Sequence, residues 1–241
     1  MSITVAALAG KIAYLNQDIT NIRWTLKELI GWMNSAGREV VILKPNSLTS
    51  TANADLVAGT KQTVPTGALE LINVIRNMGA DGATPGRTIT GVSADVLNQM
   101  LPDWHTATAD PSVKHFVYDP KQDQKTYYVY PPQPAATTQK IEVVISITPA
   151  EIAYVDESLA SYAAVNALGE AGKLDDIYEG AMIDYCLYPA YAKDSEHTAN
   201  AARSATHYQA FASALGVKLK NEFMMAPAMQ FAPQAAAGGG Q

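Results

Sequence analysis

Histidine and aspartate are the residues of this chain whose chemistry could hold a metal ion. His105 and His115 lie close in the sequence to Asp103, Asp110 and Asp119. Zinc accepts imidazole and carboxylate ligands, but its sites carry them at short, recognisable spacings. These five residues follow no such spacing, so the sequence favours polar positions in loops and strands and predicts no metal site.

A second set of reactive groups lies in the C-terminal half. Asp175 and Asp176 could bind a cation, but acidic residues also stabilise the first turn of a helix, and the sequence favours that role. Cys186 is the only cysteine, which predicts a small buried side chain and excludes an internal disulfide. His197 and His207 lie ten positions apart on one predicted helix, whereas two ligands of one ion need the i, i+4 spacing.

The familiar enzyme signatures are missing from the sequence. No glycine-rich loop is followed by Lys and Ser or Thr, and neither H-E-x-x-H nor G-x-S-x-G occurs. Tyr127, Tyr128 and Tyr130 could stack on bases, but Lys125 is the only basic residue beside them, so packing within a strand is favoured. We therefore expect a protein that is not an enzyme and that needs no cofactor.

Composition limits the remaining classes. The chain has 241 residues, a net charge of −6 and 17% charged residues, where about 25% is usual for a soluble protein. An acidic chain lacks the basic face of a general nucleic-acid binder. The sequence has no apolar run of about 18 residues and no secretory leader pattern, which predicts no membrane association. So few charges predict a surface covered by partner proteins or by small polar residues.

The N-terminal residues predict two helices that could carry such a surface. A helical stripe of apolar residues covers residues 4–15. After a polar break, Thr25 and Glu28 form a capping box that begins a second helix. Pro45 is expected to end this helix near Leu43, because proline disfavours helical geometry in the residue before it.

The middle of the chain predicts an antiparallel sheet. Residues 53–57 and 60–64 are expected to form a hairpin. Residues 69–78 fit a strand or a helix, and the turn signals that follow favour a strand with residues 87–92 as its returning partner. Ser93 is a plausible cap of a short helix at 93–100. Further strands are predicted at residues 113–119, 125–130 and 140–147, the second of them closed by Pro131 and Pro132.

The C-terminal part predicts helices followed by a different kind of segment. Leu174 is expected to open a helix that Pro189 kinks or ends, and a further helix is expected from about Ser195 to Leu215, with Gly216 as its stop. Residues 217–241 cannot build a core of their own. Their large apolar side chains predict docking on a partner: Phe223, Met224, Met225, Met229 and Phe231.

These patterns predict an α+β fold. Residues 1–47 and 149–216 are expected to form a helical body, and residues 48–148 a β-rich insertion, called here the β insertion. Residues 217–241 are expected to form an extended C-terminal tail. The partner-binding residues are predicted on this tail.

Several short strings, taken together in their order and spacing, resemble a family of tailed-bacteriophage head-to-tail adaptor (connector) proteins. The resemblance covers roughly residues 10–216, and Pro189 departs from it, since a residue compatible with a straight helix is expected there. The strings are Asn21–Thr25 with Leu29 and Trp32, Arg38–Val41, Ala58–Gln62, Val74–Gly79, Pro102–His105, Tyr128–Pro132, Tyr191–Asp194 and His207–Tyr208.

The resemblance implies a structural virion protein, found in the neck between capsid and tail after assembly in the host cytoplasm. Such adaptors form an oligomeric ring, usually a dodecamer, that binds the portal protein on one side and the tail nozzle or tube on the other. Genomic DNA passes through the ring during ejection without sequence-specific binding, and a mildly acidic chain suits such a channel. The alternative is a tail-tube or tail-completion subunit, and an enzyme of unfamiliar chemistry is the third class.

Overall fold

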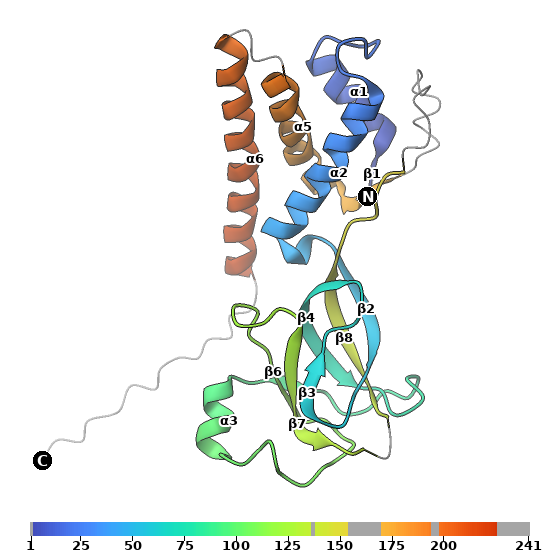
Figure 1. The fold of residues 1–241 in the computed structure, drawn as a ribbon, viewed down its shortest axis with the longest axis vertical. Helices are drawn as coiled ribbons and strands as arrows, with labels where there is room; N and C mark the ends of the chain where they lie inside the picture. The colour runs from blue at the N-terminus through green and yellow to red at the C-terminus, as the bar shows by residue number, and fades with distance from the viewer. Residues whose placement is uncertain (1, 136–137, 154–169, 194–197, 226–241) are drawn as a thin grey trace, which may run out of the picture.

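The computed structural model describes residues 2–135, 138–153, 170–193 and 198–225, with the backbone alone for residues 217–225. Most helices gather at one end of the long axis of the molecule and most strands at the other (Figure 1). Together they form an α+β fold, as the sequence predicted. None of the described helices is both long enough and apolar enough to span a bilayer.

Four of the described helices lie at the helical end: α1 (Val5–Leu15), α2 (Leu26–Leu43), α5 (Glu179–Lys193) and α6 (Thr198–Met225). The capping box is confirmed, because the Glu28 N–H donates to Thr25 Oγ1 at 3.4 Å and the Thr25 N–H donates to Glu28 Oε2 at 3.1 Å. α2 ends at Leu43 as predicted, and a 3-10 turn, η1 (Pro45–Ser47), follows. A short antiparallel pair, β1 (Ser2–Thr4) and β9 (Glu170–Asp175), joins the N-terminus to this end.

The helical body has one continuous apolar core. α5 packs against α1, α2 and α6, and in Figure 1 α6 lies at one edge of the layer and α1 at the other. The Phe211 ring is fully buried with its centroid 5.1 Å from that of Tyr185. The largest fully buried side chains of this core come from several helices and from β9: Leu8, Ile12, Leu29, Ile30, Met33, Leu174, Met182, Phe211 and Leu215.

The β insertion contains two sheets and a short helix. One sheet has the order β2-β8-β4 and is antiparallel throughout. The other has the order β3-β7-β6-β5, with the β5–β6 pair parallel. The bounds are β2 (Thr49–Asp55), β3 (Gly59–Thr63), β4 (Ala68–Asn77), β5 (Thr90–Gly91), α3 (Ala94–Met100), β6 (His115–Val117), β7 (Thr126–Gln133) and β8 (Lys140–Ile147).

A buried asparagine ties the sheets of the β insertion together. The Asn77 amide at the end of β4 donates to the carbonyls of Arg87 at 2.9 Å and Val113 at 2.8 Å. Its Oδ1 accepts from the Val113 N–H at 2.9 Å. Since Asn77 and Val113 are buried, these bonds fix how the segment before β6 lies against β4.

Strand pairing in the β insertion differs from the prediction. The expected hairpin was wrong, because β2 pairs with β8 and β3 pairs with β7. β4 takes β8 as its main partner, but the predicted return is present over a short stretch. An antiparallel bridge joins Arg76 to Thr88, the Asn77 N–H donates to the Arg87 carbonyl at 2.9 Å, and the Ile89 N–H donates to the Ile75 carbonyl at 3.1 Å. Pro131 and Pro132 do not close β7, which runs to Gln133. The turn signals located the strands, but packing of distant segments decided their partners.

Three helix ends also differ from the prediction. Leu174 lies in β9, and α5 begins only at Glu179, after the 3-10 turn η2 (Asp176–Tyr178) that the Asp175 side chain caps. Of the two effects predicted for Pro189, an end of the helix is wrong, because α5 continues to Lys193, and a kink stays a prediction. Gly216 does not end α6 either, since its backbone remains helical to Met225. A glycine lowers helix stability but does not force a stop.

Candidate partner interfaces

The reactive side chains named from the sequence pack as structural groups. His105 Nδ1 lies 2.9 Å from Thr60 Oγ1, and its ring stacks on Trp104 with centroids 3.7 Å apart. The His115 ring stacks on Tyr130. Among the described residues, no group of three His, Cys, Asp or Glu side chains is arranged to hold a metal ion. The aspartates that flank these histidines in the sequence therefore do not converge with them on an ion site.

Three further side chains are partly or fully buried among their neighbours. Cys186 is fully buried, and burial raises the pKa of its thiol. Tyr127 is fully buried in the β insertion, where desolvation raises the pKa of its hydroxyl and makes the ring inaccessible for base stacking. His207 Nδ1 lies 3.0 Å from Asp184 Oδ1, and the imidazole stacks on Tyr191. The other histidine of that prediction, His197, lies outside the described residues.

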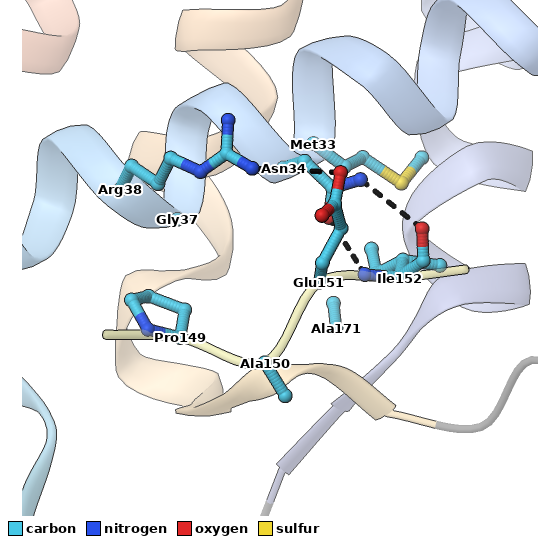
Figure 2. Close-up of a pocket in the computed structure, with 9 residues that line it drawn as sticks. All are labelled: Met33, Asn34, Gly37, Arg38, Pro149, Ala150, Glu151, Ile152 and Ala171. Atoms are coloured by element: carbon cyan, nitrogen blue, oxygen red, sulfur yellow. Dashed lines mark hydrogen bonds and ion pairs between the residues drawn. The ribbon is translucent and has the colours of Figure 1, made fainter. Parts of the chain in front are cut away.

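The chain returns from the β insertion to the helical body beside α2 (Figure 2). The Asn34 side chain clamps this return, because its Nδ2 donates to the Ile152 carbonyl at 3.1 Å and its Oδ1 accepts from the Ile152 N–H at 2.8 Å. Arg38 and Glu151 add an exposed ion pair at 3.5 Å. A cavity of about 10 Å³ lies beside them. It has room for no more than one water, so this junction is a structural joint.

Larger hollows lie on the outer surface and are apolar. One of about 540 Å³ lies on α1 and α5 and is lined mainly by Ala6, Ala7, Gly10, Tyr14 and Ile183. We call it the α1–α5 groove. Tyr14 at its rim is 73% exposed. Together with Leu15, which is 52% exposed, and the apolar lining of the groove, it forms a contiguous apolar patch, and such patches are typical of protein–protein contact surfaces.

The loop between α1 and α2 presents further apolar side chains on a fixed backbone. The Asp18 carboxylate accepts three N–H groups of this loop, from Ile22 at 3.0 Å and from Arg23 and Trp24 at 2.9 Å. Burial of the carboxylate opposes ionisation, but these bonds prevail and lower the pKa of Asp18. Ile19 and Ile22 are 64% and 82% exposed. The loop is therefore organised to display two isoleucines.

A second apolar patch lies on the β insertion. Met100 at the end of α3 is 74% exposed, and Leu101 follows it at 43%. Beside them is a hollow of about 270 Å³ whose wall includes Trp104 and Tyr130. The Trp104 indole is fixed by donation to Asn98 Oδ1 at 2.9 Å. This end of the molecule thus offers another surface on which a partner could pack.

The residues predicted to bind a partner lie at and beyond the end of α6. Phe223, Met224 and Met225 belong to the last turns of that helix, whose C-terminal end points toward the β insertion (Figure 1). Met229 and Phe231 lie outside the described residues. Sequence reasoning singled out this segment and missed the α1–α5 groove and the Ile19–Ile22 loop. A signal for the loop was present, since two isoleucines stand among polar residues between the helices.

A comparison with known protein families identifies the kind of protein that carries these surfaces. The sequence matches the family described as SU10 adaptor protein over residues 3–232, nearly the whole chain. The chain belongs to the SU10 adaptor protein family. This is a family of phage head-to-tail adaptors, as the resemblance implied, and no curated protein matches the sequence. The chain is therefore a bacteriophage adaptor and, as a class, a structural protein. In an SU10 adaptor, exposed apolar surfaces are places where other virion proteins can bind.

Proposed function

We propose that this protein forms a ring in the neck of the virion, between the portal protein and the tail nozzle or tube. About twelve copies make up the ring, and the genome passes through its bore during ejection. The chain assembles with the portal after synthesis in the host cytoplasm. Its role is to join two structures of the particle and to keep the channel between them continuous.

The family match over residues 3–232 carries this proposal. The surface supports it, because large apolar side chains are exposed at both ends of the molecule, on the α1–α2 loop and on α3. A joining protein needs contact surfaces at both ends, whereas an enzyme needs one enclosed pocket with convergent polar groups. The net charge of −6 also fits a channel that does not hold DNA.

We propose that residues 217–241 dock on the portal through Phe223, Met224, Met225, Met229 and Phe231. The composition supports this, since residues 223–241 carry no charged side chain and include five large apolar ones. Burying one such side chain contributes about 1.5–3 kcal/mol. Loss of Met229 and Phe231 together is therefore expected to weaken portal binding at least tenfold.

Two truncations of different chemistry test the docking. Deletion of residues 226–241 removes Met229 and Phe231, whereas deletion of residues 235–241 removes only alanine, glycine and glutamine. The first truncation is expected to lose co-purification with the portal protein, and the second to retain it. A Phe223→Ser variant extends the comparison to the helical part. Portal attachment that survives both the longer deletion and Phe223→Ser contradicts the docking.

A further inference from the structure

The α1–α5 groove has features that packing within one copy does not explain. Its only charged lining residue, Lys11, is neutralised by Glu179 at 2.7 Å. Tyr14 and Leu15 stand at its rim and are 73% and 52% exposed. The groove is thus an uncharged hollow with large apolar side chains left in solvent, an arrangement that water disfavours.

Two glycines stand open on the helices that form this hollow, and one of them, Gly10, lines it. Gly10 lies in the middle of α1, and a Cβ built there meets no atom within 4 Å. Gly180, one turn before the groove-lining Ile183 on α5, is equally open. Glycine lowers helix stability relative to alanine, and its small size is not needed for contacts inside this copy. A close-packed neighbour would explain why the position lacks a side chain.

The opposite edge of the helical body carries a matching ridge. Ala201, Ala205, Tyr208 and Ala212 are exposed on α6 at alternating spacings of four and three, which places them on one helix face. Tyr208 stands out from the small residues and is 47% exposed. Arg203 is the only Lys, Arg, Asp or Glu between residues 199 and 216, so this face and the groove can meet without burying an unpaired charge.

The length of α6 matches the groove. Tyr14 on one copy and Tyr208 on the other each leave roughly 100–170 Å² exposed, which is a small part of the about 800 Å² that a specific interface buries on each partner. Helix-on-helix contact must supply the remainder. α6 has 28 residues and α1 has 11, so α6 is long enough to cover the whole groove, which is about 15 Å long.

We propose that the α1–α5 groove binds the α6 ridge of a second copy of this chain, with Tyr208 seated over Gly10. α1 and α6 lie at opposite edges of the helical layer (Figure 1), so each copy can use both helices without competition. Such a head-to-tail contact repeats from copy to copy and closes into a ring when the rotation fits. The inference rests on the proposed ring and names the surfaces that build it.

A glycine substitution separates this interface from the stability of one copy. Gly10→Leu is expected to raise the melting temperature of the single copy by about 2–4 °C, because leucine favours the helix and meets open space. It also fills the groove, so concentration-dependent self-association of the full chain, measured by native mass spectrometry, is expected to be lost. Gly31→Leu is the matched control, since Gly31 lies equally open on α2 outside the groove, and it is expected to associate normally.

The same experiment can overturn the inference. A Gly10→Leu chain that associates like the unmodified chain, or an unmodified chain that stays monomeric at every concentration, contradicts it. Portal binding is measured in parallel. If Gly10→Leu binds the portal and self-associates like the unmodified chain, the interface is refuted and the adaptor function is unaffected. If the unmodified chain itself does not bind the portal, the result counts against the adaptor function.

Cross-linking tests which faces meet. Ala7→Cys lies in the groove and Ala205→Cys on the ridge, and the native Cys186 is fully buried. With a short bis-maleimide linker, the double variant is expected to give a ladder of covalent oligomers, and each single variant only monomers. Dimers from Ala7→Cys alone would show groove-to-groove contact and overturn the head-to-tail proposal, as would a double variant that stays monomeric.

Discussion

The helical body and the β insertion are held together by different interactions. The helical body relies on apolar side chains that interlock between helices, such as Phe211 between α5 and α6. The β insertion has an apolar core of its own, which includes Val74, Tyr127 and Ile141, and adds backbone ladders and buried polar side chains that bond to neighbouring backbone. Most buried polar side chains of the described residues belong to the insertion: Thr60, Gln62, Asn77, Gln133 and Ser146.

This difference has a consequence for how the two regions can bind partners. Helices satisfy their own backbone hydrogen bonds, so a helical body can leave a whole face apolar until a neighbouring subunit covers it. Sheets expose unpaired backbone N–H and C=O groups at their edges, and these groups need hydrogen-bond partners. The uncharged groove and ridge accordingly lie on helices, whereas the apolar patch of the insertion lies on its one short helix, α3, and the loop after it.

The largest effect is expected from the helical core. Phe211→Ala removes a fully buried ring from the α5–α6 contact and should lower the free energy of unfolding by about 3–5 kcal/mol, measured by urea denaturation. Phe211→Leu keeps most of the volume and should cost less than about 1.5 kcal/mol. Equal losses for the two variants would show that interlocking of side chains does not govern this region.

The next largest effect is expected from the buried polar side chains of the β insertion. Asn77→Ala leaves the buried N–H and carbonyl of Val113 without their partner, while the Arg87 carbonyl keeps the backbone N–H of residue 77. We expect a loss of about 2–3 kcal/mol in the free energy of unfolding. Asn73→Ala, at an exposed position of the same strand, removes only the bond that Asn73 Oδ1 accepts from the Val74 N–H at 2.9 Å and should cost about 0.5–1 kcal/mol. An Asn77→Ala loss as small as that of the control would break the comparison between the regions.

A smaller, local effect is expected at the joint between the regions. Asn34→Ala removes both hydrogen bonds to Ile152, worth about 1–2 kcal/mol together. Amide exchange at Ile152 should become about tenfold faster. Arg38→Ala, which breaks only the exposed ion pair with Glu151, should leave that exchange rate nearly unchanged. Similar acceleration in both variants would contradict the role given to the asparagine clamp.

The smallest effect concerns the loop that displays Ile19 and Ile22. The folded pKa of Asp18 lies below its ordinary value, so its contribution to stability is complete above about pH 4 and is lost as the pH falls through the folded value. Asp18→Asn should therefore flatten the acid limb of the stability profile. The check is urea denaturation at a series of acidic pH values, and identical limbs for both proteins would contradict it.

Local signals predicted the elements of this fold well. The Thr25 capping box, the stop at Pro45, the Ser93 cap and the strand at 140–147 all depend on residues close together in the sequence, and the structure contains each of them. The partner of β2 is β8, which lies about ninety residues away. No local pattern encodes that choice, and the plausible turn at Ala58-Gly59 pointed to the wrong neighbour.

The candidate interfaces were predictable only in part. The apolar composition of the C-terminal segment is visible in the sequence, and so is a glycine inside the apolar stripe of α1. Gly10 faces open space and not a neighbouring helix, because of the way in which α1 packs on α5. The sequence states which side chains are small, but the packed structure shows which of them leave a hollow.

A reconstruction of the intact phage particle tests the adaptor assignment most directly. The account predicts that this chain forms a ring, of about twelve copies, lying directly against the portal, with α6 of each copy on α1 of the next. A six-fold ring farther down the tail, with this chain absent from the portal, would contradict it.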